Sequence, residues 1–245
     1  MNLRESMRAM NRLVGRDRNP APAVAPIDIP EPFGARLVSM FSGEPQVGED
    51  GRAYPLDGVT SATQPTCMWL YQLCLEERPK KTLEVGLAYG FSTVSFLAAI
   101  ARNNIGHHTA VDPFERSAWH GIGLANVRTL GMEEKFRFVD AKSVPALANF
   151  GEAGERFDVI FIDGNHRFDD ALVDFTLGSE LCPQGGYIAL DDMWLPSIRK
   201  VVAFIRTNRK DFVSVETPTA NIAAFRRVGL DGRSWNHFED FTTVR

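Results

Sequence analysis

The sequence contains few cysteines, and their spacing matches no metal-binding motif. Only three occur, Cys67, Cys74 and Cys182, and none forms a CxxC pair. Cys67 and Cys74 are seven residues apart in a segment of helical character, so we expect both on one face as small apolar core residues. Neither a zinc finger nor a disulfide framework is supported, and a reducing, cytoplasmic location is expected.

Long hydrophobic runs and a surplus of charge of one sign are also missing. No apolar stretch approaches the roughly 20 residues that a membrane-spanning helix needs, and the first residues lack the apolar core of a secretory signal. The formal net charge is −4, without the cationic excess that binds nucleic acid or anionic membranes. We therefore expect neither nucleic acid nor membrane as a partner.

At 245 residues the chain is long enough for one substantial α/β domain and short for two. Arginines and apolar side chains of residues 1–18 form separate helical stripes, which predicts a surface helix. Four prolines between residues 20 and 30 predict an extended linker. We therefore assign residues 1–30 to an N-terminal helix and linker, and residues 31–245 to the folded domain. A homodimer is expected from the frequency of such assemblies alone.

From residue 60 onward, segments with helical periodicity alternate with short apolar strands. The expected helices are 60–77, 92–104, 119–131, 143–150, 167–182 and 195–208, and the expected strands are 80–86, 107–114, 136–141, 157–164, 185–192, 212–218 and 222–229. Continuously apolar strands between helices predict a parallel sheet covered on both faces. The last connection is too short for a crossover, so the final two strands should pair antiparallel. The sequence thus predicts a doubly wound, mostly parallel α/β sheet of seven strands that ends in a hairpin.

The stretch TLEVGLAYGFST, residues 82–93, joins the first of these strands to the next helix. Gly86 and Gly90 permit close approach of a ligand to the backbone, and Ser92 lies where free N–H groups favour an anion. The dinucleotide fingerprint GxGxxG is absent, and so is the Lys-Ser/Thr pair of a phosphate loop. A carboxylate at Glu84 would repel pyrophosphate but would suit a ligand that carries an ammonium group.

Asp112 ends the second strand, where an acidic residue can bind both hydroxyls of a ribose. An amino acid joined to adenosine satisfies both requirements, and this describes S-adenosylmethionine. Simpler interpretations exist: the glycines permit a turn, Ser92 caps a helix, and Asp112 with Pro113 ends a strand. An NAD-dependent oxidoreductase and a non-catalytic cofactor-binding protein are the alternatives from other functional classes.

With these residues in place, the sequence resembles the class I S-adenosylmethionine-dependent methyltransferases, which have a Rossmann-like fold. The resemblance is strongest to small O-methyltransferases of the catechol O-methyltransferase-like and macrolide-sugar branches, and it covers about residues 55–227. LEVGLAYGFST resembles the glycine loop of the family, VDPF its second acidic motif, DGVTSATQ (57–64) the segment over the cofactor, and AKS (141–143) the adenine-side turn. The cofactor-binding residues that the resemblance implies are Thr60, Ser61, Glu84, Gly86, Gly90, Ser92, Asp112, Lys142, Ser143 and Asp163.

Three acidic residues follow two apolar strands that we expect to be neighbours. Asp163 ends the strand FDVIFID, and Asp191 and Asp192 end GGYIALDD. The ends of adjacent parallel strands lie about 5 Å apart, and three unpaired carboxylates there would repel one another. A hard divalent cation such as Mg²⁺ resolves this repulsion, and acids at these positions resemble the family's metal site. The alternative is a metal-independent methyltransferase in which Asp163 contacts only the cofactor and Asp192 caps a helix.

His166 follows Asp163 by three residues, where catechol-type enzymes carry a lysine. Its ordinary pKa suits a general base near neutral pH, although a histidine at a helix start is often only a surface residue. We assign His166 and Asp163 to catalysis in an O-methyltransferase that modifies a small-molecule hydroxyl. The Asp-Asp pair favours a sugar or natural-product diol as acceptor, with a catechol-type phenol next.

Overall fold

The computed structural model describes residues 28–242. The helix predicted for residues 1–18, and most of the linker that follows it, lie outside the described residues. No helix of the described part is long and apolar enough to cross a membrane.

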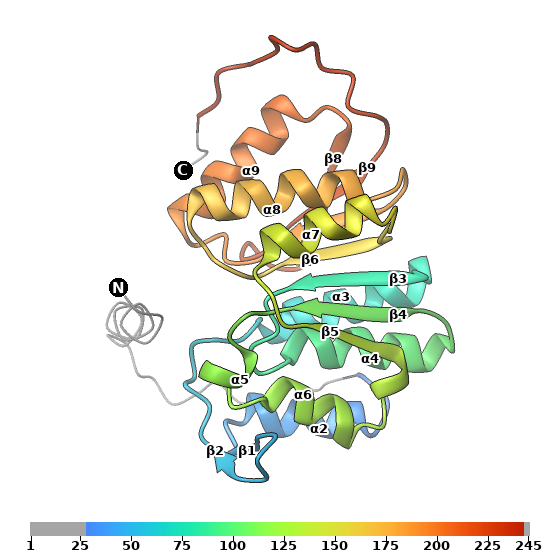
Figure 1. Ribbon diagram of the computed structural model, residues 1–245, viewed down its shortest axis with the longest axis vertical. Coiled ribbons are helices and arrows are strands. Elements are labelled where there is room, and N and C mark those ends of the chain that lie inside the picture. The colour runs from blue at the N-terminus through green and yellow to red at the C-terminus, as the bar shows by residue number, and fades with distance from the viewer. Residues whose placement is uncertain (1–27, 243–245) are drawn as a thin grey trace.

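The described chain is organised around a seven-stranded sheet with the strand order β5-β4-β3-β6-β7-β9-β8 (Figure 1). The five strands from β5 to β7 are parallel, whereas β9 runs antiparallel to both of its neighbours, β7 and β8. This arrangement confirms the predicted sheet and its terminal hairpin. The strands are β3 (Lys81–Val85), β4 (His107–Val111), β5 (Phe136–Val139), β6 (Val159–Ile162), β7 (Tyr187–Leu190), β8 (Phe212–Val215) and β9 (Ala223–Arg227).

Helices cover both faces of the sheet because alternate residues of each strand point to opposite faces. Phe161 of β6 belongs to one hydrophobic core with the helices of the first face, and its neighbour Ile160 belongs to a second core on the other face. The first face is covered by α2 (Phe33–Phe41), α3 (Gln64–Glu77), α4 (Phe91–Asn103) and α6 (Ile122–Thr129), and the second by α7 (Ser143–Glu152), α8 (Phe168–Leu181) and α9 (Pro196–Asn208).

The order of the strands along the chain reverses at β3, which pairs with β4 on one side and with β6 on the other. In doubly wound sheets the loops at the carboxyl ends of the strands around such a reversal form the ligand site. Here these loops are 86–90, 112–121, 140–142 and 163–167, and the loop after β7 lies next to them. The short helix α5 (Glu115–Ala118) lies in the second of these loops.

Residues 31–56, for which no element was predicted, contain α2 and a small antiparallel sheet of β1 (Gln46–Val47) and β2 (Ala53–Tyr54). The hairpin is held against the loop after β4 by an ion pair of 2.9 Å between Arg116 Nε and Glu49 Oε2. The ring of Tyr54 also stacks on His120, with 3.8 Å between the centroids. The N-terminal segment thereby covers one flank of the carboxyl edge.

The chain after β9 returns along α9. Asn208 at the end of α9 bonds the backbone of Glu239 in both directions, at 2.9 Å and 2.8 Å. Further along, Phe241 packs against Phe204 and accepts a hydrogen bond of 3.3 Å from Lys200 at its carbonyl. The segment therefore runs from the end of α9 towards its beginning.

Candidate active site

The glycine loop joins β3 to α4 and packs directly on the loop after β6. Gly86 has a φ of +94°, and a β-carbon at this residue would overlap the carbonyl oxygen of Asp163. Gly90 has a φ of +83° at the N-cap of α4, and a β-carbon there would lie 3.1 Å from the Cα of Gly123. Both positions therefore require glycine, and the first one sets the distance between the predicted cofactor loop and the predicted metal loop.

Glu84 is fully buried, and its carboxylate contacts three polar side chains. Its carboxylate accepts hydrogen bonds from the hydroxyls of Ser92 and Thr93 in the first turn of α4. His108 Nε2 lies 3.2 Å from its second oxygen, and His108 Nδ1 lies 2.8 Å from Thr82 Oγ1. Glu84 thus anchors the start of α4, and Ser92 takes part in this anchoring as a hydrogen-bond donor. Their predicted role at the methionine end of a cofactor stays a prediction.

Asp112 supports the glycine loop from the neighbouring strand. One carboxylate oxygen accepts from the amides of Leu87 and Ala88 at 3.0 Å and 3.1 Å, and the other accepts from the amide of Phe114 at 2.7 Å. Burial raises the pKa of Asp112, against the lowering effect of these three hydrogen bonds. The contacts agree with the interpretation that Asp112 ends the strand, and its binding of a ribose is not tested.

The other predicted cofactor residues lie in two loops at this edge. Thr60 lies just before α3, where its hydroxyl donates to Asp57 at 2.7 Å, and Ser61 follows it. Lys142 is the N-cap residue of α7 and Ser143 is the first residue of that helix. Burial raises the pKa of Asp174 in α8 to about 6, while a hydrogen bond from Ser143 opposes the shift. The hydroxyl of Ser143 is thus bonded to Asp174 of α8.

The loops after β6 and β7 bring two carboxylates and an imidazole together. His166 Nε2 lies 3.4 Å from Asp163 Oδ1 and 3.0 Å from Asp192 Oδ2. One ligand atom from each residue lies within 4.8 Å of the others, as a shared metal ion requires. All three side chains are partly exposed, between 20% and 26%. Asp163 and Asp192 therefore lie close together, as predicted, and His166 is the third residue of this acidic cluster.

Asp191, the third predicted metal ligand, has a different environment. It is 2% exposed, and its Oδ1 accepts a hydrogen bond of 2.9 Å from Asn221 Nδ2. Among the described residues, the group that could share an ion contains His166 in place of Asp191. The carboxyl group of Asp191 is thus held by Asn221 and is not one of the three groups that could share an ion.

The crowding of negative charge shifts the pKa values of this cluster. Burial raises the pKa of Asp163, and burial followed by the charges of Asp163 and Asp192 raises that of Asp191. Burial lowers the pKa of His166, but the hydrogen bond and charge of Asp163 and the charge of Asp192 outweigh this effect, and the pKa is raised. The site favours bound positive charge, whether a proton or a cation.

Two residues near the cluster were not identified as parts of it from the sequence. Trp194, in the loop after β7, donates its indole N–H to Asp192 Oδ1 at 2.8 Å. Asn221 precedes β9, and the pairing of Leu190 with Ala223 brings it beside the end of β7. The sequence contained no signal for Asn221, because its place depends on the pairing of β9 with β7, whereas only the pairing of the last two strands with each other was predicted.

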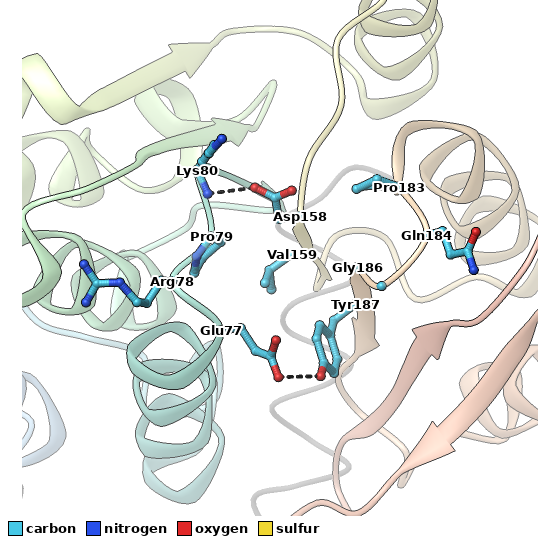
Figure 2. Close-up of a pocket in the computed structure, with 11 residues that line it drawn as sticks. Glu77, Arg78, Pro79, Lys80, Asp158, Val159, Pro183, Gln184, Gly186 and Tyr187 are labelled. Carbon is cyan, nitrogen blue, oxygen red and sulfur yellow. Dashed lines mark hydrogen bonds between the residues drawn. The ribbon is translucent and has the colours of Figure 1, made fainter.

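The opposite edge of the sheet carries a cavity of about 340 Å³ (Figure 2). It lies where β3, β6 and β7 begin, and Figure 2 shows Glu77 accepting a hydrogen bond of 2.7 Å from the hydroxyl of Tyr187. The amide of Lys80 donates to Asp158 at 2.7 Å. No residue of the acidic cluster or of the glycine loop lines this cavity, so it is distinct from the candidate active site.

Comparison with known proteins agrees with this geometry. Residues 83–193, which run from β3 through the loop after β7, match a family model described as a methyltransferase domain. Over these residues the chain is similar to methyltransferase domains. The match begins one residue before Glu84 and ends one residue after Asp192, so it includes the glycine loop and the acidic cluster. The resemblance drawn from the sequence is confirmed.

The curated proteins that are similar to this chain include O-methyltransferases. A caffeoyl-CoA O-methyltransferase of Populus kitakamiensis is 31% identical over 131 residues, which are 50% of this chain and 51% of that protein. The O-methyltransferase hkm8 of Aspergillus hancockii is 28% identical over 137 residues, 56% of this chain and 52% of that protein. The chain thus spans about half the length of the curated relatives that it matches.

Solved methyltransferases share the fold. TomG of Streptomyces achromogenes, an O-methyltransferase of tomaymycin synthesis solved with SAM, has a TM-score of 0.60 at 18% identity, over 70% of this chain and 83% of that chain. The SAH-bound methyltransferase PaMTH1 of Podospora anserina has a TM-score of 0.63 at 13% identity, over 94% and 97% of the two chains. At these identities the comparison confirms the Rossmann-like methyltransferase fold.

Proposed function

We propose that this protein is an S-adenosylmethionine-dependent O-methyltransferase that uses a divalent cation, Mg²⁺, and methylates a hydroxyl of a small molecule. The observation that carries the proposal is the cluster of Asp163, His166 and Asp192 beside a glycine loop that packs on Asp163 itself. The methyltransferase domain match and the O-methyltransferase relatives support the cofactor and the reaction class.

The donor set fits a hard cation. Asp163 and Asp192 offer carboxylate oxygens within 4.8 Å of each other and of His166, and carboxylates are the side chains that Mg²⁺ prefers. These two aspartates would hold the ion, and Asp191 lies beside them, bonded to Asn221. When bound, the cation lowers the pKa of an acceptor hydroxyl and fixes its orientation. A metal-independent reaction is the alternative.

In the proposed reaction the methyl group moves from the sulfonium to the acceptor oxygen in an in-line displacement, which leaves a methyl ether and S-adenosylhomocysteine. The hydroxyl proton goes to the imidazole of His166, whose conjugate acid Asp163 and Asp192 stabilise. Rigid positioning can supply much of the rate of such a displacement. The close packing of Gly86 on the Asp163 backbone supports a fixed distance between the two substrates.

For the acceptor we retain a vicinal diol, of a sugar or natural product, as proposed from the Asp-Asp sequence. The similarity to caffeoyl-CoA O-methyltransferases favours the second candidate, a catechol-type phenol. A homodimer, a cytoplasmic location and the absence of nucleic-acid or membrane partners stay predictions.

Isothermal titration calorimetry of the full chain tests the proposal. We expect S-adenosylhomocysteine to bind and NAD not to bind, and Mg²⁺ to bind to the wild type but not to Asp163→Asn. Asp169→Asn, which changes an exposed acid in the first turn of α8, is the matched control. Methyl transfer from labelled S-adenosylmethionine to a panel of sugar diols and catechols, with and without EDTA, then identifies the acceptor. Binding of NAD alone would contradict the proposed reaction, and full turnover in EDTA would contradict the metal.

A further inference from the structure

Trp194 makes a direct hydrogen bond to the acidic cluster, although its ring is largely exposed. Its Nε1 donates a hydrogen bond of 2.8 Å to Asp192 Oδ1. The residue is 45% exposed. An indole has a single donor and no acceptor, and here that donor is directed at a predicted metal ligand.

The loop that carries Trp194 is fixed at several points of its backbone. The amide of Met193 donates to the carbonyl of Asn221 at 2.8 Å, and the amide of Leu195 donates to the carbonyl of Asp192 at 2.9 Å. Arg199 in α9 donates to the carbonyl of Trp194 at 2.9 Å. The indole is therefore directed by a loop with little freedom to move.

Asp192 itself has a φ of +60°, a left-handed conformation that residues other than glycine adopt rarely. Such backbone conformations persist where the surrounding contacts enforce them, and they are concentrated at functional sites. This conformation places the two oxygens of Asp192 in different surroundings: Oδ1 accepts from Trp194, and Oδ2 lies 3.0 Å from His166 Nε2.

We propose that Trp194 is a positioning residue for Asp192, an inference that rests on the proposed metal-dependent function. Its indole N–H holds Oδ1, so that Oδ2 alone is presented to the cation and to His166. Carboxylate groups rotate readily about their terminal torsion, and without this hydrogen bond the orientation of Asp192 would no longer be set. Groups that orient metal ligands in this way typically contribute 10–100-fold to metal affinity.

The decisive variant is Trp194→Phe, which keeps an aromatic ring and removes the N–H. Trp235→Phe is the matched control, because Trp235 is 97% exposed and far along the chain. Calorimetric titration with MgCl₂ should give an affinity roughly 10-fold weaker for Trp194→Phe and an unchanged affinity for Trp235→Phe. Mg²⁺ should also change the tryptophan emission of the wild type and of Trp235→Phe, and this change should be lost in Trp194→Phe.

Trp194→His, which retains a ring N–H, should recover part of the lost affinity and guards against a general packing defect. Wild-type Mg²⁺ affinity in Trp194→Phe would overturn the inference, as would equal losses in Trp194→Phe and Trp194→His at unchanged melting temperature. If Asp163→Asn abolishes binding in either of these cases, the proposed function stands. Absence of Mg²⁺ binding in the wild type, with S-adenosylhomocysteine present, would instead refute the metal itself and this inference with it.

Discussion

Asp191 and Asp192 are adjacent in the chain, yet their carboxylates have separate partners. Asp191 accepts a hydrogen bond from Asn221 and is 2% exposed, whereas Asp192 lies 3.0 Å from His166 and is partly exposed. Only the second of the two carboxylates therefore shares the opening with Asp163 and His166.

This difference predicts unequal effects of two conservative substitutions. Asp192→Asn should abolish Mg²⁺ binding, because it removes a carboxylate from the cluster. Asp191→Asn should weaken binding only about 10-fold, the effect of a residue that lies beside the ligands. Calorimetry with MgCl₂ measures both, and the reverse order would identify Asp191 as the direct ligand, as the sequence first suggested.

Replacement of His166 by alanine should lower the rate of methyl transfer by about 10²–10⁴-fold, the usual contribution of a general base. Binding of S-adenosylhomocysteine should not change, because His166 contacts the aspartates and not the glycine loop. Single-turnover measurements with saturating cofactor separate the two quantities. An unchanged rate would remove His166 from the mechanism.

Gly86→Ala should destabilise the protein and impair cofactor binding together. The added β-carbon would overlap the Asp163 carbonyl, and the φ of +94° is unfavourable for alanine, so a loss of at least 1–3 kcal/mol in the free energy of unfolding is expected. Gly151→Ala is the control, because this glycine lies in α7, where a β-carbon would have its nearest neighbour at 3.8 Å. It should stabilise the protein by about 0.5–1 kcal/mol. Urea denaturation measures both changes.

Glu115 makes the stability of the protein depend on pH. Burial, followed by the charge of Asp112, raises its pKa to about 9 from an ordinary 4.5, and its Oε2 has no partner among the described residues. An acid whose pKa is raised on folding stabilises the protein relatively at low pH, and this contribution is lost as pH rises towards 9, by at most about 1.4 kcal/mol per unit.

Glu115→Gln should reduce this dependence, because the amide carries no charge to bury. Between pH 6 and 9 the melting temperature of the wild type should therefore fall more steeply than that of the variant. Asp50→Asn, which changes an acid on the exposed hairpin, should follow the wild type. Parallel curves for wild type and Glu115→Gln would show that Glu115 is not the group responsible.

Removal of divalent cations should destabilise the folded protein increasingly as pH rises. Asp163 and Asp191 have raised pKa values, so protons occupy the cluster at low pH and their loss at higher pH leaves repelling charges. Added Mg²⁺ should therefore raise the melting temperature more at pH 8 than at pH 6. An equal increase in melting temperature at pH 6 and pH 8 would indicate that Mg²⁺ binds at a site other than the acidic cluster.

The sheet and its helices could be predicted from the sequence because their signals are local. Each buried strand is continuously apolar, and each following helix has its own periodicity. The N-terminal helix α2 and the β1–β2 hairpin were not predicted. The two strands of the hairpin have only two residues each, which is too short for a recognisable pattern. Their stability depends on contacts with the distant loop after β4, such as the pair of Glu49 and Arg116, which no local pattern reveals.

At the site, the sequence indicated which residues gather at the carboxyl edge but not the direction of every side chain. Glu84 lies between Leu83 and Val85, which belong to the core on the α7–α9 side. Strand alternation therefore directs Glu84 beneath α4, towards Ser92. The separation of Asp191 from Asp192 depends on the left-handed φ of Asp192 and on the return of β9 beside β7, two features that arise only in the folded chain.

The pairing of β3 with β6 brings together two parts of the candidate active site that come from different stretches of the chain (Figure 1). The glycine loop and Asp112 precede residue 113, and the acidic cluster with Trp194 follows residue 162. Sequence change in the later stretch can thus alter which molecule is methylated while the cofactor loop is inherited unchanged. The contact that limits this freedom is Gly86 on the Asp163 backbone, so residue 86 should remain glycine while the residues around it diversify.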